Sequence, residues 1–253
     1  MKNVVLLIML SLSFGCATVP DNSVSDERDP FESTNRDLWA INYDVLDKNV
    51  VRPSAVGYEK LGTPVRNGIR NVLLNIEEPL NAVNNLLQGK VSDSGSNLGR
   101  FLINTTVGLL GVFDPATNMG IAPKRENFSQ TLGAWGIGNE GPYLMVPLYG
   151  PATPRSIAGD VLDNVVYPMT IMNPFQIFLT FALSGLESRV QLFEQEPLLN
   201  QSLDPYNFVK EVYFQNDQFR VTDGNSGTSV FDSQSDDEAF FEDEELLLED
   251  EID

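Results

Sequence analysis

The stretch from residue 128 to residue 151 restricts the possible folds of this chain more than any other part of the sequence. It reads FSQTLGAWGIGNEGPYLMVPLYGP, with five glycines, three prolines, four aromatic residues and a single charge at Glu140. Glycine and proline at this density argue against a long helix. The stretch is nevertheless too apolar for an ordinary solvated loop, and helical patterns flank it on both sides. We therefore expect a non-helical insert that packs against apolar surroundings within a helical frame.

Composition excludes several classes of function. The 253 residues include 16 basic and 36 acidic side chains, and the resulting net charge of −20 argues against a nucleic-acid partner. The chain has no histidine, which is the commonest general base and transition-metal ligand. A single cysteine permits neither an internal disulfide nor a thiolate zinc site, and no Gly-x-Ser-x-Gly elbow is present. We expect no catalytic site, no metal and no cofactor, other than lipid attached to the chain itself.

The first fifteen residues have the pattern of a secretory signal peptide. A lysine at position 2 precedes a short apolar run, and Gly15 stands directly before Cys16. The run is too short to span a bilayer. The site resembles a bacterial lipobox, which predicts a diacylglyceryl and acyl lipid on Cys16. The alternative is a plain cleaved signal with an incidental cysteine. Ala17 follows, rather than the aspartate that resembles an inner-membrane retention signal, and this points to the outer membrane.

Hydrophobic periodicity predicts a mainly α fold. Pro, Asp and Thr residues at helix-start positions and apolar residues at helical spacing recur along the chain. The predicted helices begin near residues 30, 63, 79, 92, 154, 175, 187 and 205, and Pro53, Pro79 and Pro115 are expected to end or break those before them. No long alternating pattern predicts a strand, and Tyr143 to Tyr149 is the one segment expected to form a short hairpin.

Two uncharged runs are the expected contacts with lipid. Residues 101–113 and 165–186 carry no charge, and the second run has the length of a transmembrane helix. Prolines interrupt it, so its clean part, 175–186, is too short to cross, and we expect short helices that dip into a bilayer or line a core. Polar Asn104 and Thr105 lie inside the first run. They would be hydrogen-bonded groups in a soluble core, or would face a wet passage in a membrane-embedded ring.

Acidic pairs in the body carry no clear catalytic signature. Glu77 and Glu78 are neighbours in sequence and precede Pro79, so a helix-start signal is favoured over a carboxylate pair for glycoside hydrolysis. Asp160 and Asp163 have helical spacing but no partner that marks a site.

The C-terminal segment differs in composition from the body. Residues 223–253 hold 13 acidic side chains and no basic one. We consider two alternatives, a solvated disordered tail and a tail that folds as an amphipathic helix on a partner's basic-rimmed apolar groove. The apolar residues of the second alternative are Phe240, Phe241, Leu247 and Leu248.

The ordered motifs of the chain resemble the MlaA or VacJ family of outer-membrane lipoproteins, which act in maintenance of lipid asymmetry. The resemblance runs from about Asp29 to Gln215. The matching segments include DPFE at 29–32, RP at 52–53, PVRN at 64–67, EEP at 77–79, LQG at 87–89, RFLINT at 100–105, TLG at 131–133, GPY at 141–143, YGP at 149–151 and DPY at 204–206.

The resemblance implies a ring-like bundle of amphipathic helices that lies in the inner leaflet of the outer membrane of a Gram-negative bacterium, lipid-anchored on its periplasmic side. It further implies a central amphipathic channel that removes phospholipids misplaced in the outer leaflet and passes them to the periplasmic carrier MlaC, with trimeric porins as membrane partners. The corresponding division of the chain is a signal peptide (1–15), a lipidated tether (16–28), a helical ring domain (29–220) and an acidic flexible tail (221–253).

These expectations assign roles to particular residues. The predicted channel lining is polar and consists of Asn35, Arg36, Asn42, Asn104, Thr105, Thr106 and Arg155. The predicted gate is the central stretch at the channel wall, through Phe128, Gly133, Trp135, Gly141 and Tyr143, with Phe128 and Trp135 near Leu38 and Trp39. Docking of the carrier is expected through Phe240, Phe241, Leu247 and Leu248.

Two competing functions remain beside the channel. A structural lipoprotein that scaffolds porins needs no polar passage, so leucine at Asn104 or Thr105 should leave its activity intact. A lipase is disfavoured by the missing histidine and serine elbow.

Overall fold

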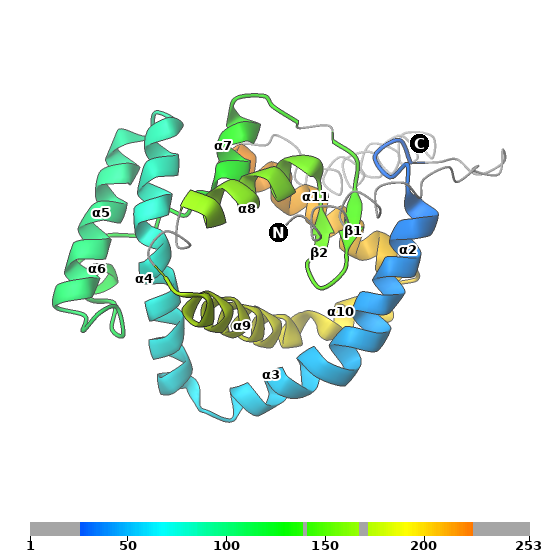
Figure 1. Cartoon of the computed structure of the whole chain (residues 1–253), viewed down its shortest axis with the longest axis horizontal. Coiled ribbons are helices and arrows are strands. Elements are labelled where there is room, and N and C mark those ends of the chain that lie inside the picture. The colour runs from blue at the N-terminus through cyan, green and yellow to red at the C-terminus, as the bar shows by residue number, and fades with distance from the viewer. Residues whose placement is uncertain (1–25, 139–140, 167–171, 225–253) are drawn as a thin grey trace, which may run out of the picture.

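The helices of the chain follow one another around a ring, and one of them, α9, crosses its interior (Figure 1). The computed structural model describes residues 26–138, 141–166 and 172–224. Across these ranges the architecture is helical apart from one two-stranded sheet, so the expected mainly α ring with a short hairpin is confirmed. No helix in these ranges is both long enough and apolar enough to cross a membrane.

A continuous helical arc forms one side of the ring. It consists of α2 (Glu32–Ala40), the π-helix η1 (Ile41–Val51) and α3 (Arg52–Glu59). Within η1 the side-chain amide of Asn49 donates to the carbonyls of Asp44 and Val45, at 3.2 and 2.8 Å. These bonds satisfy backbone carbonyls of the π-helix. Pro53 lies in the first turn of α3, directly after η1, and the helix runs through it without a break. The prediction that Pro53 ends this helix is wrong.

The second side of the ring is the single helix α4 (Thr63–Leu87), which packs along α5 (Val91–Thr106). Pro79 lies inside α4. The predicted break at this proline is therefore wrong. Buried polar side chains of α4 on both sides of the proline, Asn75 and Asn81, bond to other segments and hold the two halves in one line. Tertiary contacts thus override the local preference of proline.

The helix that begins near residue 92 ends earlier than predicted. It was expected to continue to Asp114, but α5 stops at Thr106, and a turn with left-handed residues follows. Gly111 has a φ of 90°, and a Cβ there would lie 2.7 Å from the Cβ of Asn75, so the turn needs glycine where it touches α4. The short helix α6 (Pro115–Asn118) comes next, capped by the Asp114 carboxylate, which accepts from the Thr117 amide at 3.1 Å.

The central stretch is part helix and part hairpin. Residues Phe128–Ala134 form α7, which begins with a reciprocal capping box between Asn127 and Gln130. The expectation of a wholly non-helical insert is therefore wrong in its first seven residues. The hairpin predicted after Tyr143 is confirmed. Strands β1 (Leu144–Val146) and β2 (Gly150–Ala152) pair antiparallel, with Met145 opposite Pro151.

The remaining helices close the ring. α9 starts with a capping box between Asn173 and Gln176, and Asp204 caps α11 by accepting from the amides of Tyr206 and Asn207. These closing elements are α8 (Pro154–Val166), α9 (Pro174–Gln191), the 3₁₀ turn η2 (Leu192–Gln195), α10 (Glu196–Gln201) and α11 (Pro205–Val221).

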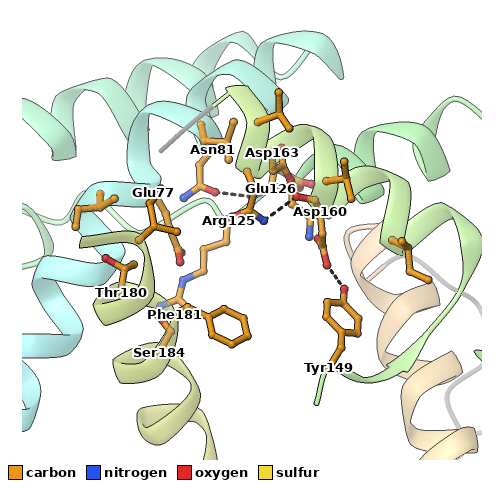
Figure 2. A pocket seen from close by; sticks show the side chains of 18 of the residues that line it. Glu77, Asn81, Arg125, Glu126, Tyr149, Asp160, Asp163, Thr180, Phe181 and Ser184 are labelled. Carbon is orange, nitrogen blue, oxygen red and sulfur yellow. Dashed lines mark hydrogen bonds between the residues drawn. The ribbon is translucent and has the colours of Figure 1, made fainter. Parts of the chain in front are cut away.

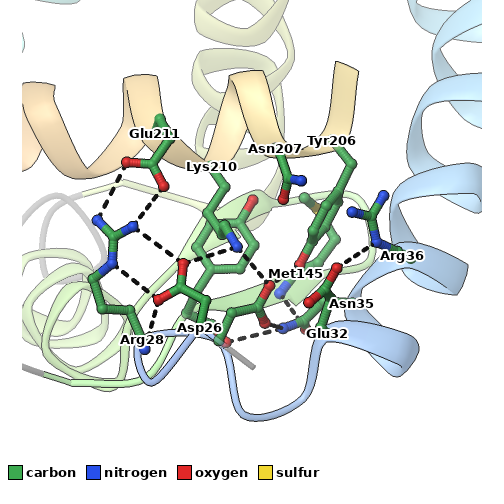
Figure 3. A network of polar contacts seen from close by, with 12 residues as sticks. Asp26, Arg28, Glu32, Asn35, Arg36, Met145, Tyr206, Asn207, Lys210 and Glu211 are labelled. Carbon is green, nitrogen blue, oxygen red and sulfur yellow. Dashed lines mark hydrogen bonds and ion pairs between the residues drawn. The ribbon is translucent and has the colours of Figure 1, made fainter. Parts of the chain in front are cut away.

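A cluster of charges joins the start of the described chain to α11 (Figure 3). We call this cluster the clamp and define it as Asp26, Arg28, Asp29, Lys210 and Glu211. Arg28 lies 2.6 Å from Glu211, and the Lys210 ammonium lies 3.0 Å from Asp26 and 3.3 Å from Asp29. Asp29 also accepts from the Tyr206 hydroxyl at 2.5 Å, so the two Asp-Pro-aromatic motifs of the sequence meet here. The clamp ties the first helix of the ring to the last.

The hydrophobic core near the clamp is small and aromatic. Tyr143, Met145 and Tyr206 are buried together, and Leu38 and Trp39 of α2 pack against them. The hairpin is therefore held between α2 and α11.

Candidate functional site

The burial pattern of the protein is the reverse of that of a water-soluble domain. Among the described residues, twenty polar or charged residues are buried, against ten hydrophobic ones. Over the same residues, 35 large hydrophobic side chains are exposed. Soluble proteins bury apolar side chains and leave few large apolar patches in water. This chain therefore presents an apolar exterior around a polar interior, as a protein does when hydrocarbon surrounds it.

Helix α4 shows the pattern within a single turn. Asn84 and Asn85 are 1% exposed, whereas the neighbouring Leu86 is 58% exposed. The buried amides have partners, because Asn84 donates to Asp163 at 3.3 Å and Asn85 donates to the carbonyl of Lys124 at 3.1 Å. Polar groups thus hold the helix to the rest of the ring, and its apolar side is left for surroundings outside the chain.

A cavity of about 1080 Å³ opens inside the ring. It lies between α4, the segment before α7, the hairpin, α8 and α9, and Figure 2 shows its wall. Much of the lining is apolar and comes from Ile76, Leu80, Val146, Ile157, Val161, Val165, Pro174, Ile177, Phe178 and Phe181. The volume falls at the upper end of typical small-molecule sites.

Helix α9 supplies one wall of the cavity. Its first twelve residues carry no charge, and the capping box at Asn173 fixes where the helix starts. Thr180 and Ser184 face the cavity together with Phe181, so this wall presents hydroxyl groups within an apolar surface. The helix crosses the ring and thereby encloses the cavity on the side away from α8.

The opposite wall carries two carboxylates on α8. Asp160 accepts a hydrogen bond from the hydroxyl of Tyr149 on the hairpin, and Asp163 accepts from the Phe128 amide at 2.9 Å. Burial raises the pKa of both carboxyls, against the lowering effect of these hydrogen bonds. Burial and the bond to Asp160 also raise the pKa of Tyr149 far above its ordinary value, so this hydroxyl stays protonated as a donor.

Arg125 and Glu77 bring opposite charges into the cavity from different segments. Arg125 lies in the connection between α6 and α7, and its side chain extends toward Phe181 and Ser184 (Figure 2). Glu77 lies on α4, with its carboxyl beside the Arg125 side chain. Water reaches both side chains through the cavity, but protein surrounds them on the wall. This burial raises the pKa of Glu77, although the charge of Arg125 acts to lower it.

The neighbouring Glu78 has a different environment. It points away from the cavity, and its carboxylate accepts from Arg100 at 2.6 Å and from Asn97 at 2.8 Å. Arg100 reaches on to Asp114 at 2.9 Å, so one buried guanidinium joins α4, α5 and the cap of α6. Glu78 thus stabilises the helical frame and Glu77 lines the cavity, because successive side chains on a helix point in different directions.

The family model described as MlaA lipoprotein matches residues 27–220 of the chain. The chain belongs to the MlaA lipoprotein family. It is 37% identical over 230 residues to the intermembrane phospholipid transport system lipoprotein MlaA of Escherichia coli strain K12, with 87% of this chain and 88% of the relative covered. The protein of the same name in Haemophilus influenzae is 34% identical over 227 residues, covering 87% of this chain and 89% of the relative.

A solved structure supports the same assignment. It comes from work on the structural basis for maintenance of bacterial outer membrane lipid asymmetry, and it is 37% identical to this chain. The TM-score is 0.70, and the alignment covers 76% of this chain and 98% of the solved one. The ring of helices is thus shared with a structure from a relative of the MlaA family.

The residues predicted to line a channel near the N-terminus lie elsewhere in this MlaA-family fold. Asn35 is buried and bonds to Asp29 and to the backbone of the hairpin. Arg36 pairs with Glu32 and with Asp204 at the start of α11. Asn42 donates to the carbonyl of Val146 and accepts from the amide of Leu148, both at 2.9 Å. None of Asn35, Arg36 and Asn42 is among the residues that line the cavity.

The other four predicted lining residues also stabilise the frame and are not part of the cavity wall. Asn104 donates to Asp114 and accepts from the amide of Ala116. Thr105 accepts from Asn75, and Thr106 donates to the carbonyl of Leu102 in its own helix. Arg155 is buried and bonds to Ser129 and Asp217, which ties α8 to α7 and α11. Asn104, Thr105 and Arg155 therefore join different segments of the frame, whereas Thr106 bonds within its own helix.

The residues predicted to form a gate are distributed between α7 and the core. Phe128 and Trp135 form an edge-to-face pair, with ring centroids 6.3 Å apart, at the two ends of α7. A Cβ on Gly133 would come within 2.8 Å of Arg155 and 2.6 Å of Val221, so this glycine allows close packing of helices. Gly141 precedes Tyr143, which is fully buried. It is Tyr143 and Met145 that pack near Leu38 and Trp39.

Cys16 and the four tail residues Phe240, Phe241, Leu247 and Leu248 lie outside the described residues. Their predicted roles in lipidation and carrier docking stay predictions.

The cavity residues were missed because their sequence context indicates something else. Glu77 stands beside Pro79 and looks like a helix start, and Arg125 stands in a polar segment before the central stretch. Asp160 has a helical neighbour but no partner within its own helix. No local signal in the sequence sets these charges apart, and only the fold brings them to one cavity.

Proposed function

We propose that this chain is a lipid-anchored outer-membrane protein that removes misplaced phospholipids from the outer leaflet and passes them toward the periplasm. The observation that carries the proposal is the combination of an apolar exterior with a charged, hydroxyl-bearing cavity inside the ring. Its relatives are named for intermembrane phospholipid transport, and the related solved structure concerns outer-membrane lipid asymmetry. Attachment of lipid at Cys16 would hold the ring against the periplasmic side of the membrane.

The physical basis of transport is desolvation. A phospholipid headgroup that crosses hydrocarbon loses its water, which is strongly unfavourable unless other polar groups replace it. The cavity offers such groups in Arg125, Asp160 and the hydroxyls of α9, while the apolar lining and exterior accommodate acyl chains. The protein would only supply a path for the phospholipid, so its residues need to bind and release lipid without a chemical step.

Selectivity for one leaflet follows from how such a ring would sit. Short amphipathic helices bury an apolar face in one leaflet without spanning the bilayer. With its rim in the inner leaflet, the ring would exclude lipids of that leaflet and admit those of the opposite one. We propose the periplasmic carrier MlaC as the acceptor and trimeric porins as membrane partners, with the acidic tail as the docking segment for the carrier. Deletion of residues 223–253 should then weaken carrier binding.

The proposal is tested by filling the cavity. Thr180 faces the cavity from α9, and Thr180→Trp would place an indole in the path. Ser188→Trp is the matched control, because Ser188 is exposed on the same helix and does not line the cavity. Each full-length variant is expressed in Gram-negative cells that lack their own family member, and outer-leaflet aminophospholipid is measured with a membrane-impermeant amine reagent.

We expect the wild type and Ser188→Trp to restore a low outer-leaflet signal, and Thr180→Trp to leave it as high as in cells without the protein. If folded Thr180→Trp clears lipid as well as the wild type, the cavity is not the path, and a structural role beside porins becomes the better explanation. Leucine at Asn104 no longer serves this purpose, since Asn104 holds Asp114 and Ala116 in place.

A further inference from the structure

The cavity contains six ionisable groups of the acidic and guanidinium kinds, and most of them are already satisfied. Glu126 bonds to Gln88 and Lys90, and Asp163 bonds to Asn84 and the Phe128 amide. Asp160 accepts from Tyr149, and Arg220 donates to Gln130 at 2.7 Å. Each of these four charges therefore has a hydrogen-bonding role in the frame of the cavity.

Arg125 and Glu77 are the exception. Neither side chain makes a hydrogen bond or an ion pair with any other residue in ranges 26–138, 141–166 and 172–224, although each is exposed to the cavity. Their charges interact electrostatically, since the positive charge of Arg125 acts to lower the pKa of Glu77. Figure 2 shows the Glu77 carboxyl beside the Arg125 side chain on the cavity wall, with no ion pair between them. Because neither group is bonded to the other, both charges are available to a ligand.

The two charges match the two charges of one lipid class. A guanidinium is well suited to a phosphate, because its N–H groups can donate two parallel hydrogen bonds. A carboxylate accepts from an ammonium group. Zwitterionic phospholipids with an ethanolamine headgroup carry a phosphate and a primary ammonium two carbon atoms apart, so one headgroup can contact two neighbouring opposite charges. The apolar side chains Ile76, Leu80 and Phe181 around the pair suit the glycerol and upper acyl chains.

We propose that Arg125 and Glu77 form a headgroup site that selects zwitterionic, amine-bearing phospholipids, with the phosphate on Arg125 and the ammonium on Glu77. This inference rests on the proposed transport function and adds a substrate class to it. Arg125 would bind every phospholipid through the phosphate, and Glu77 would distinguish among them through the rest of the headgroup.

The charge balance of the wall disfavours anionic lipids. The lining holds four carboxyl side chains, Glu77, Glu126, Asp160 and Asp163, but only two arginines. A phosphatidylglycerol headgroup would satisfy Arg125 and bring no cation to Glu77. The Glu77 carboxylate would then remain unpaired next to an added negative charge, which is the kind of mismatch that discriminates between ligands. An ethanolamine headgroup is neutral overall and leaves neither side chain unpaired.

The experiment measures binding of two short-chain lipids to the full-length protein by titration calorimetry. The probes are dihexanoylphosphatidylethanolamine and dihexanoylphosphatidylglycerol, below their micelle concentrations. We expect the wild type to bind the ethanolamine lipid on the order of fivefold more tightly, the discrimination available from a partly solvated ion pair. Glu77→Gln should remove this preference by weakening only the ethanolamine lipid, whereas Arg125→Gln should weaken both lipids.

Matched controls exist on the same fold. Arg70 on α4 and Glu59 on α3 are exposed, make no ion pair with another described residue and do not line the cavity, so Arg70→Gln and Glu59→Gln should bind like the wild type. Equal affinity of the wild type for both lipids, or a preference unchanged in Glu77→Gln, would overturn the headgroup site and leave the transport proposal standing. Failure of the folded wild type to bind either lipid would instead count against the proposed function.

Discussion

The clamp and the cavity wall both concentrate charged side chains, but they treat these charges differently. In the clamp every charge is paired. Lys210 lies against Asp26 and Asp29, and Arg28 bridges Asp26 and Glu211. In the cavity Arg125 and Glu77 face open space without a bonded partner among the described residues. The first arrangement closes the ring, and the second leaves charge available.

In a protein with an apolar exterior and a polar interior, this difference separates charges that stabilise the fold from charges that can bind a ligand. Buried charges are tolerated when partners replace their water, so the buried Lys210 and Asp29 are explained by their mutual contact. A charge that has lost part of its water without gaining a partner is not explained in this way, and such groups mark sites where a ligand binds. Variants in the clamp should therefore change stability, whereas variants in the cavity should change binding.

The largest expected effect comes from Lys210→Met in the clamp. Lys210 is 3% exposed, and its removal leaves Asp29 buried without its cationic partner. Breaking one side of a buried ion pair lowers the free energy of unfolding by about 3–5 kcal/mol. Denaturant unfolding followed by circular dichroism in detergent micelles measures the change. Lys48→Met is the control, since Lys48 forms an exposed pair with Asp44 and its loss should change the free energy of unfolding far less. Similar losses in the two variants would contradict the assigned role of the clamp.

A smaller effect is expected from Tyr206→Phe, which removes one hydroxyl and keeps the ring. This hydroxyl donates to Asp29 at 2.5 Å in a buried environment. Loss of a hydrogen bond to a buried carboxylate should lower the free energy of unfolding by about 1–3 kcal/mol. Tyr43→Phe is the matched comparison, because the Tyr43 hydroxyl donates to Asn200 at an exposed site. If both substitutions change the unfolding midpoint equally, the Asp29 contact adds nothing specific.

The sequence predicted the kind of fold because local signals agreed with it. The Asp-Pro start at Asp204 before α11 is a cap that the structure retains, and Asn173 caps α9 although it stands in the segment expected to interrupt the uncharged run. The signals failed where tertiary contacts opposed them. Pro79 remains inside α4 because polar residues on both sides of it are bound to other segments, and no local rule contains that information.

The candidate site was harder to predict from the sequence. Asn104 and Asn42 were predicted to line a channel because a polar side chain in hydrocarbon needs a polar partner or water. In the fold these side chains form hydrogen bonds to other segments of the chain. The cavity instead combines Glu77, Arg125 and Asp160 from three distant segments, and their unpaired or paired state depends on geometry that spacing along the chain does not encode.

Asn42→Ala tests how the hairpin is held in place beside the cavity. The Asn42 amide holds the hairpin that carries Val146 and Tyr149 into the cavity, through bonds of 2.9 Å to Val146 and Leu148. Two lost bonds at a half-buried site should lower stability by about 1–2 kcal/mol. Hydrogen exchange should show the Leu148 amide exchanging faster, with the amides of α5 unchanged. Asn71→Ala is a control, since Asn71 makes one exposed bond to Val112. Unchanged exchange at Leu148 would show that the hairpin is held by other contacts.

The smallest expected effect on stability is that of Glu77→Gln, and its sign should be opposite to that of the clamp variants. Burial raises the pKa of Glu77 above its ordinary value of 4.5, against the pull of Arg125 and Arg220 and with a push from Glu78. A raised carboxyl pKa means that the ionised form destabilises the fold at neutral pH and that protonation relieves this as the pH falls. The variant should therefore be slightly more stable than the wild type at pH 7, by at most about 0.5 kcal/mol, because solvent in the cavity screens the charge of the exposed Glu77 side chain. The gap should close as the pH falls toward 4.5.

Asp26 in the clamp gives the contrasting pH dependence. Its hydrogen bond from Arg28 holds its pKa well below the ordinary value of 3.8, so the stability it contributes is fully present above pH 3.8 and is lost only as the pH falls below that value. Unfolding of the wild type, Asp26→Asn and Glu77→Gln at pH 7, pH 5 and pH 3 separates the two, because the Asp26 contribution changes only between pH 5 and pH 3. Asp26→Asn should be less stable than the wild type at pH 7, where Glu77→Gln is more stable. A loss of stability in Glu77→Gln at neutral pH would mean that Glu77 is paired in the folded protein after all, and the distinction between the clamp and the cavity would fail at its central residue.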